Sequence, residues 1–138
     1  MTAGALNRGA IGAVISGRIR DLAEHISPLQ PRTFPIFARG HSTLGQSPFT
    51  RVSALNVPIT ISPEFSNLQE GEPEFPAVVV NPGDYVIADA DGVVCVPQGI
   101  WENVVEKARV GRDVDAKCLE SIRNGEGVGM AFKKWRGK

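Results

Sequence analysis

Short apolar runs punctuated by glycine and proline set the pattern of the first part of the chain. Residues 2–8 are predicted to form a short helix, with Thr2 as its N-terminal cap and Gly9 as its C-terminal stop. The apolar run over residues 10–16 follows directly and predicts a strand. The chain is therefore expected to begin with a helix that leads into a strand.

The next stretch predicts one more helix and two more strands. Residues 20–26 have the pattern of one or two helical turns, and a Ser-Pro pair ends them. Short strands are expected over residues 34–38 and 56–61. Residues 62–76 are rich in acidic, amide and proline residues with few apolar anchors, so we interpret them as a surface loop.

The strongest strand signal comes from three valine-rich runs over residues 77–80, 85–88 and 93–97. The turn sequences Asn-Pro-Gly-Asp and Asp-Ala-Asp-Gly separate them. Three strands in rapid succession predict an antiparallel meander. The turn residues Asp84, Asp89 and Asp91 resemble a metal cluster in composition. Aspartate in such turns bonds to nearby backbone N–H groups, so we interpret them as structural.

From residue 98 the apolar residues follow a helical period. Gly111 is expected to break this helix, and Gly125 and Gly127 are expected to end it. The basic residues of the tail, 133–138, are interpreted as a solvated or oligomer-contacting end. The apolar face of the helix predicted from residue 98 comprises Ile100, Val104, Val105, Ala108, Val114, Cys118, Leu119 and Ile122.

Length and charge limit the classes of function. With 138 residues the chain is expected to form a single domain over residues 1–138. Its 15 basic and 15 acidic residues cancel, so no overall field attracts nucleic acid or an anionic membrane. We therefore expect neither as a partner.

The cysteines and the N-terminus bear on the compartment. Cys95 lies in a predicted strand and Cys118 on a helical apolar face, so both are interpreted as small core residues rather than a disulfide pair. The N-terminus lacks the pattern of a signal peptide, and no apolar run has the length of a membrane span. These features favour a soluble protein of the cytoplasm.

Candidate chemistry is concentrated where the first strand meets the second helix. Gly17 allows close approach of a ligand to the backbone, Arg20 offers a planar fork for a carboxylate, and Asp21 offers a hard oxygen to a divalent cation. On the dipeptide alone, a second interpretation is open: Arg20 and Asp21 form a solvated pair, with Asp21 favouring the helix N-terminus.

Further candidates lie nearby in the sequence. Arg39 and His41 follow a predicted strand and could line a pocket, with His41 as an acid or base, although loop residues of these types are often surface groups. His25 could face a metal or cover the edge of the core. Glu102 and Glu106 could transfer protons at a neighbouring subunit's site, but a solvated helix face explains them more simply.

Three motifs in order resemble the RraA-like family. They are Ala-Leu-x-Arg-Gly-Ala-x-Gly-x-Val-Ile-x-Gly-x-x-Arg-Asp over residues 5–21, Phe-Pro-Ile-Phe-Ala-Arg-Gly over 34–40, and Asn-Pro-Gly-Asp-x-x-x-Ala-Asp-x-Asp-Gly-Val-Val-x-Val-Pro over 81–97. That family includes 4-hydroxy-4-methyl-2-oxoglutarate aldolases, oxaloacetate decarboxylases and regulators of ribonuclease activity. The resemblance runs from near residue 3 to about residue 110.

The resemblance implies an α/β fold, a swivelling domain of the α/β/β type that assembles as a homotrimer or a homohexamer with sites at subunit boundaries. It further implies that Arg20 binds the carboxylate of a small 2-oxo acid and that Asp21 holds Mg²⁺ or Mn²⁺, mostly through waters. A divalent ion on the 2-oxo oxygen would stabilise the charge left by carbon–carbon cleavage.

Members of the family carry further residues before the position of Met1, including a glycine-containing loop that lines the site. The chain is therefore expected to represent the C-terminal two-thirds of the family domain, lacking the N-terminal elements. Two functions remain open. The first is a divalent-metal-dependent lyase, of the retro-aldol or decarboxylase type, or a related enol-forming enzyme. The second is a non-catalytic scaffold or truncated subunit that binds a protein partner.

Overall fold

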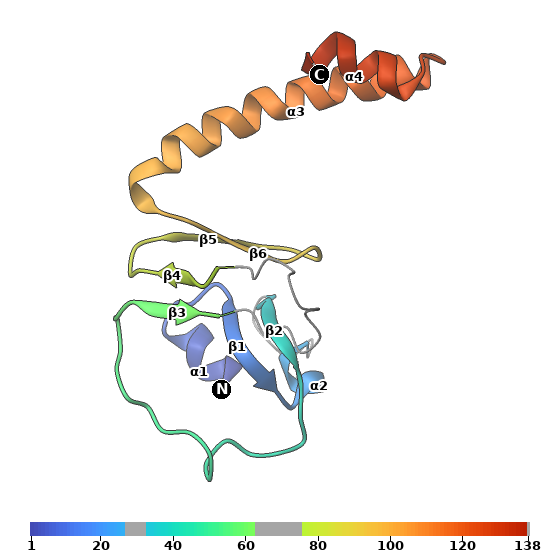
Figure 1. Ribbon diagram of the computed structural model, residues 1–138. Coiled ribbons are helices and arrows are strands. Elements are labelled where there is room, and N and C mark those ends of the chain that lie inside the picture. The colour runs from blue at the N-terminus through green and yellow to red at the C-terminus, as the bar shows by residue number, and fades with distance from the viewer. Residues whose placement is uncertain (27–32, 63–75, 138) are drawn as a thin grey trace, which may run out of the picture. The chain divides into compact units, whose positions relative to one another are not determined.

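The protein is described by a computed structural model that covers residues 1–26, 33–62 and 76–137 (Figure 1). The described residues form two compact units, residues 1–82 with 88–94 and residues 83–87 with 95–138. The loop predicted over residues 62–76 lies, apart from its ends, outside the described part. The elements in chain order are α1 (Thr2–Asn7), β1 (Ala13–Ile19), α2 (Leu22–His25), β2 (Ile36–His41), β3 (Ile59–Ile61), β4 (Val78–Val80), β5 (Tyr85–Ala88), β6 (Val93–Val96), η1 (Gln98–Ile100), α3 (Trp101–Arg123) and α4 (Val128–Arg136).

Helix α1 forms as predicted, but its cap differs from the expectation. Gly9 follows the helix with φ of +84°, a conformation that favours glycine, so the predicted stop is confirmed. Thr2 is wrong as the cap, because Met1 holds that position and Thr2 lies inside the helix. The side chain of Thr2 is instead buried and bonds to His25.

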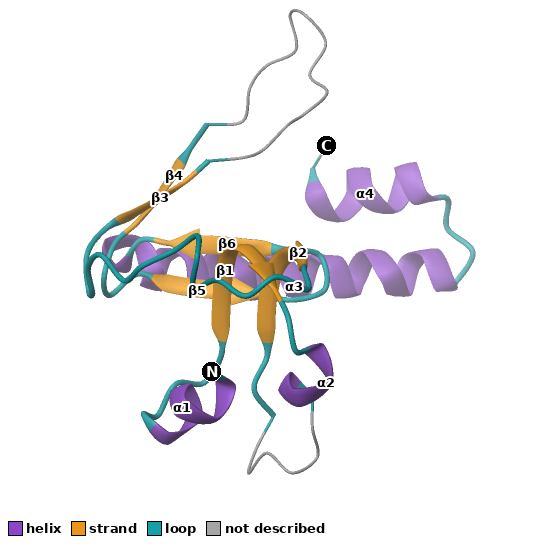
Figure 2. Ribbon diagram, turned by 90° about the horizontal axis from the view of Figure 1, so that it is seen from below, coloured by secondary structure: helices purple, strands orange, loops and turns teal. Residues whose placement is uncertain are grey.

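Strands β1 and β2 pair in parallel, from Ala13 opposite Ile36 to Ile19 opposite His41 (Figure 2). Both begin later and run further than the predicted ranges 10–16 and 34–38. The first bond of the pairing is donated by the Ala13 N–H to the Pro35 carbonyl at 2.9 Å. Pro35 can accept this bond through its carbonyl, but it has no N–H to donate to β1. Because the strands are parallel, their carboxyl ends lie at the same edge of the sheet.

The predicted three-stranded meander is wrong. β4 pairs antiparallel with β3, from Val78 opposite Ile61 to Val80 opposite Ile59, and β5 pairs with β6. In the described ranges each sheet has two strands. The strand predicted over 56–61 is reduced to the three residues of β3 that meet a partner. The predicted turn at Asp89 is confirmed: its N–H donates to the Gly92 carbonyl at 3.0 Å.

The helical region differs from its prediction in two ways. Helix α3 continues through Gly111, so the expected break is wrong; a single interior glycine costs only about 1 kcal/mol and the other 22 residues support the helix. A further helix that was not predicted, α4, ends at Arg136 and is followed by Gly137 with φ of +71°. Gly125, with φ of +91°, follows α3 as expected.

Side chains of α3 and α4 pack against each other in the second unit, where the two helices lie side by side (Figures 1 and 2). Cys118 of α3 and Ala131 of α4 are both buried, and the Cys118 thiol lies 3.8 Å from the Ala131 carbonyl. The interpretation of Cys118 as a core residue is confirmed, while Cys95 is half-buried, and both thiols are free. No helix in the described part of the chain combines the length and apolarity needed to cross a membrane.

Candidate functional site

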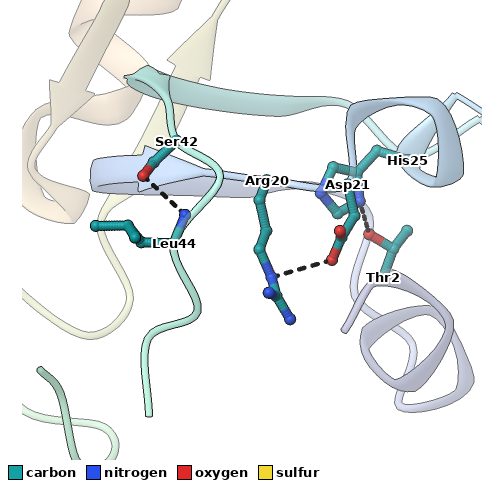
Figure 3. A network of polar contacts seen from close by, with 6 residues as sticks. All are labelled: Thr2, Arg20, Asp21, His25, Ser42 and Leu44. Carbon is teal, nitrogen blue, oxygen red and sulfur yellow. Dashed lines mark hydrogen bonds and ion pairs between the residues drawn. The ribbon is translucent and has the colours of Figure 1, made fainter. Parts of the chain in front are cut away.

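The candidate site lies at the carboxyl edge of the β1–β2 pair (Figure 3). Arg20 and Asp21 directly follow β1, and Ser42 directly follows β2. The Ser42 N–H donates to the Ile19 carbonyl at 2.8 Å, which joins the two strand ends. Ligands of open α/β sheets bind at this kind of edge, where loops after parallel strands supply the side chains.

Asp21 adopts a left-handed backbone conformation, with φ of 61° and ψ of 40°. This region is unfavourable for residues other than glycine, although aspartate tolerates it better than most. Asp21 is the N-cap residue of α2, but its side chain makes no capping hydrogen bond. The solvated-pair interpretation, in which Asp21 favours the helix N-terminus, therefore gains no capping hydrogen bond in its support.

Arg20 and Asp21 form an ion pair with 3.3 Å between Arg20 Nε and Asp21 Oδ2 (Figure 3). The two side chains are 49% and 54% exposed, so the pair contributes little to stability and both groups remain open to a ligand. Gly45, in the loop after β2, lies beside the guanidinium: a Cβ placed there would be 3.4 Å from Arg20 Nη1. No motif in the sequence singles out Gly45.

His25 is half-buried and has a side-chain partner on α1. Its Nδ1 lies 2.7 Å from Thr2 Oγ1 in a hydrogen bond that joins α2 to α1 (Figure 3). The Thr2 side chain is only 2% exposed, so the bond is shielded on that side. The prediction for His25 allowed either a metal-facing or an edge-covering role, and this contact gives it a defined neighbour on α1.

Arg39 and His41 lie within β2 rather than after a strand. The Arg39 guanidinium donates to Ser16 Oγ from Nε at 3.2 Å and from Nη2 at 3.0 Å, and Nη2 also donates to the Ser62 carbonyl at 2.6 Å. These contacts brace β2 against β1. His41 is the last residue of β2, opposite Ile19, and is exposed at the same edge as the Arg20–Asp21 pair.

Gly17 lies in an irregularity of β1. The register passes from Ile15 opposite Ala38 to Arg18 opposite Gly40, so Ser16 and Gly17 form a bulge with one more residue than the partner strand. A Cβ at Gly17 would meet only Ile15, at 3.9 Å. The glycine is thus near the site in sequence, with open space beside it.

Of the turn aspartates Asp84, Asp89 and Asp91, Asp89 bonds to nearby backbone N–H groups as predicted, whereas Asp84 has more distant partners. Asp89 Oδ1 accepts from the N–H groups of Asp91 at 2.9 Å and Gly92 at 3.3 Å. Asp84 Oδ1 accepts from the Gln98 N–H at 3.2 Å, and Asp84 Oδ2 lies 3.7 Å from the Cys95 thiol. Burial raises the pKa of Cys95, and the Asp84 carboxylate raises it further.

Metal ligation at the candidate site would depend on a single carboxylate. Within residues 1–26, 33–62 and 76–137 there is no group of three or more His, Cys, Asp or Glu side chains that could hold a metal ion. Asp21 offers a half-exposed carboxylate without a capping bond, and Mg²⁺ commonly retains several waters beside one or two carboxylates. The donor set therefore fits a hydrated Mg²⁺ or Mn²⁺ ion at Asp21.

Comparisons with known proteins bear on this arrangement. The family model RraA-like, described as Aldolase/RraA, matches residues 1–95. A protein of Halalkalibacterium halodurans, provisionally named a 4-hydroxy-4-methyl-2-oxoglutarate aldolase, is 37% identical over 101 residues, which are 73% of this chain and 39% of the relative. An uncharacterized protein of Methanocaldococcus jannaschii is 27% identical over 86% of this chain and 48% of the relative.

A solved structure supports the fold. The crystal structure of an uncharacterized protein from Pseudomonas syringae pv. tomato matches with a TM-score of 0.70 and 27% identity, over 95% of this chain and 56% of that one. The predicted α/β fold is confirmed by this match together with the family model. The chain spans less than half the length of the two curated relatives described above.

Proposed function

The chain belongs to the RraA-like family, described as Aldolase/RraA, and on that premise we propose that it is a divalent-metal-dependent lyase acting on a small 2-oxo acid. The observation that carries the proposal is the pair Arg20–Asp21 at the carboxyl edge of β1, with 3.3 Å between the charged groups and about half of each side chain exposed. A cation and an anion so close together suit a substrate that needs both a carboxylate partner and a metal.

Arg20 is proposed to bind the substrate carboxylate. Its guanidinium has planar, fork-like donors that match two carboxylate oxygens, and Gly45 adds no side chain next to Nη1. Gly17 is proposed to keep the approach to Arg20 open, because no bulky group extends from the bulge of β1. The acid would thus be oriented with its 2-oxo group toward Asp21.

Asp21 is proposed to hold Mg²⁺ or Mn²⁺ through one carboxylate oxygen, with waters as the other ligands. When bound, such an ion supplies positive charge beside the 2-oxo oxygen, where negative charge develops as the neighbouring carbon–carbon bond breaks. The left-handed backbone of Asp21 directs the residue out of the regular helix. His41, exposed at the same edge, is proposed as a pocket residue, and Arg39 as a support for the strand pair.

We further propose that the chain acts as one RraA-like domain in the cytoplasm and assembles as a homotrimer or homohexamer. Arg20 and Asp21 are half exposed, so a second copy has room to contribute groups to the site. Oligomeric mass measured by light scattering tests this part. A monomer at micromolar concentration would contradict it.

The reaction is tested by incubating the purified chain with Mg²⁺ or Mn²⁺ and either oxaloacetate or a 4-hydroxy-2-oxo acid, with released pyruvate as the readout. We expect pyruvate from at least one substrate class, and its loss when the metal is chelated. A folded, assembled protein that releases none from either class would overturn the lyase proposal. The non-catalytic scaffold would then be the better account of the chain.

A further inference from the structure

Helix α2, which follows the Arg20–Asp21 pair, has few apolar anchors. It is a single turn of four residues, too short to be stable by itself. Leu22 is 46% exposed and the flanking Ile26 is 84% exposed, so little apolar surface is buried by this segment. Something other than hydrophobic packing must therefore fix the position of the turn.

The contact that serves this purpose is the hydrogen bond between Thr2 and His25. The two atoms, Thr2 Oγ1 and His25 Nδ1, are 2.7 Å apart, although the residues are 23 positions apart in the sequence. Thr2 is 2% exposed, and His25 is the one half-buried residue of α2, whose other residues are exposed. The last residue of α2 is thereby tied to the first turn of α1.

Backbone hydrogen bonds also join this turn of α2 to Asp21. The Asp21 carbonyl accepts from the Glu24 N–H at 3.0 Å and from the His25 N–H at 3.3 Å. A displacement of His25 would therefore also displace Asp21, because one helical turn connects the two residues. The left-handed φ of 61° at Asp21 is unfavourable and is retained only if the surrounding residues hold it. Figure 3 shows the Thr2–His25 bond and the Arg20–Asp21 ion pair together.

We propose that His25 is a positioning residue: through its Nδ1 bond to Thr2 it holds α2 so that the Asp21 carboxylate lies beside Arg20, where it would hold a divalent cation. The proposal rests on the proposed function in taking Asp21 as the metal ligand. Outer contacts that orient a ligand commonly affect metal affinity by about 10- to 100-fold. The bond joins α1 and α2, so neither helix alone supplies the geometry.

Four variants separate positioning from other roles. An asparagine side chain places a polar atom near the position that Nδ1 occupies in histidine, whereas a glutamine side chain places its polar atoms nearer to the position of Nε2. His25→Asn can therefore retain the bond to Thr2, and His25→Gln loses it. Thr2→Ser keeps the hydroxyl, and Thr2→Val replaces it with a methyl group of similar size.

Two readouts follow these variants. The first is the dissociation constant for Mn²⁺, and the second is hydrogen exchange of the Glu24 and His25 amides in metal-free protein. We expect Thr2→Val and His25→Gln to weaken Mn²⁺ binding about tenfold and to speed exchange of both amides. Thr2→Ser and His25→Asn should stay near wild type in both measurements.

Ser121→Ala serves as the matched control. It removes another part-buried side-chain bond, the 2.9 Å bond from Trp135 Nε1 to Ser121 Oγ, in the unit without the site. We expect it to lower the melting temperature without changing Mn²⁺ affinity. A lower melting temperature in Thr2→Val with unchanged Mn²⁺ affinity and unchanged exchange would reduce the Thr2–His25 bond to a general structural contact and overturn the proposal.

The other outcomes are also decisive. If His25→Asn is as damaging as His25→Gln while Thr2→Val behaves as wild type, the imidazole acts directly and positioning is wrong. If Asp21→Asn leaves Mn²⁺ affinity unchanged, the proposed metal role of Asp21 fails. The exchange measurement in metal-free protein still decides whether Thr2 and His25 hold the turn, so the two failures are distinguishable.

Discussion

The edge of the β1–β2 pair and the α3–α4 hairpin are held in place by different forces. Within the strand pair itself, Val14 and Ile15 of β1 are 51% and 39% exposed, and next to its carboxyl edge α2 is held by a polar contact, Thr2 with His25. In the hairpin, Cys118 and Ala131 are 2% and 0% exposed and the helices contact each other directly. Substitutions at the edge should therefore affect binding more than stability, and substitutions in the hairpin should do the reverse.

Two aspartates make the same contrast at the level of single residues. Asp84, at the base of the β5–β6 hairpin, uses Oδ1 to accept the Gln98 N–H at 3.2 Å. Asp21 caps no helix with its side chain, and its carboxylate pairs with Arg20 at 54% exposure. The Asp84 carboxylate thus accepts a hydrogen bond from the backbone, whereas the Asp21 carboxylate is exposed to solvent.

The largest expected effect is that of Asp21→Asn. The substitution keeps the size of the side chain and removes the charge that would hold a divalent cation, so we expect pyruvate formation to fall by about a hundredfold or more. Titration with Mn²⁺ should show a matching loss of affinity. Asp84→Asn is the matched control, and equal losses in the two variants would contradict the contrast between these aspartates.

Arg20→Lys should have the next largest effect. Lysine keeps the charge but loses the two-pronged geometry that matches a carboxylate, and a charged hydrogen bond contributes roughly 1.5–3 kcal/mol. We expect the KM for the 2-oxo acid to rise about tenfold or more, while Mn²⁺ affinity changes little. A loss of metal binding without a change in KM would exchange the roles proposed for Arg20 and Asp21.

Ala131→Leu tests the other side of the comparison. Ala131 has no exposed surface, so three extra carbon atoms would have to displace the α3–α4 contact at a cost of about 1–3 kcal/mol. Chemical denaturation should report this as a lower midpoint. Mn²⁺ affinity of the folded protein should remain as in wild type, and a large change would mean that the hairpin influences the site.

Local signals in the sequence predicted several features correctly. Gly9, Gly125 and the Asp89 turn were predicted from residue type alone, because positive φ angles and side-chain turns are local properties. The junction of a strand and a helix near Arg20 and Asp21 was also predicted, although α2 begins at Leu22 rather than at Arg20. The position of Gly45 beside Arg20 depends on the course of the loop after β2 and is not visible in the sequence.

Features that depend on distant partners were missed. The pairing of β3 with β4 joins segments separated by residues 62–77, and a three-residue strand carries little periodic signal. Thr2 has the residue type of a cap, but its partner His25 is 23 residues away. Helix α4 did carry a signal: its residues Val128, Ala131, Phe132 and Trp135 have helical spacing, which the cluster of basic residues obscured.

The smallest expected effect concerns the thiol of Cys95. Burial, and to a lesser extent the Asp84 carboxylate at 3.7 Å, raises the pKa of Cys95, so less thiolate is present at a given pH than for an ordinary cysteine. Asp84→Asn removes the charge but can still accept the Gln98 N–H, so the pKa should fall and the thiolate fraction should rise.

Alkylation by iodoacetamide at pH 8 should accordingly be faster in Asp84→Asn than in wild type, with Cys95→Ala as the control that removes the reacting thiol. Cys118 is 2% exposed and should remain unreactive in the folded protein. An unchanged rate at Cys95 would mean that Asp84 acts only on the Gln98 N–H. A faster rate with unchanged Mn²⁺ affinity would distinguish two carboxylates, one adjusting a neighbouring thiol and the other holding a cation.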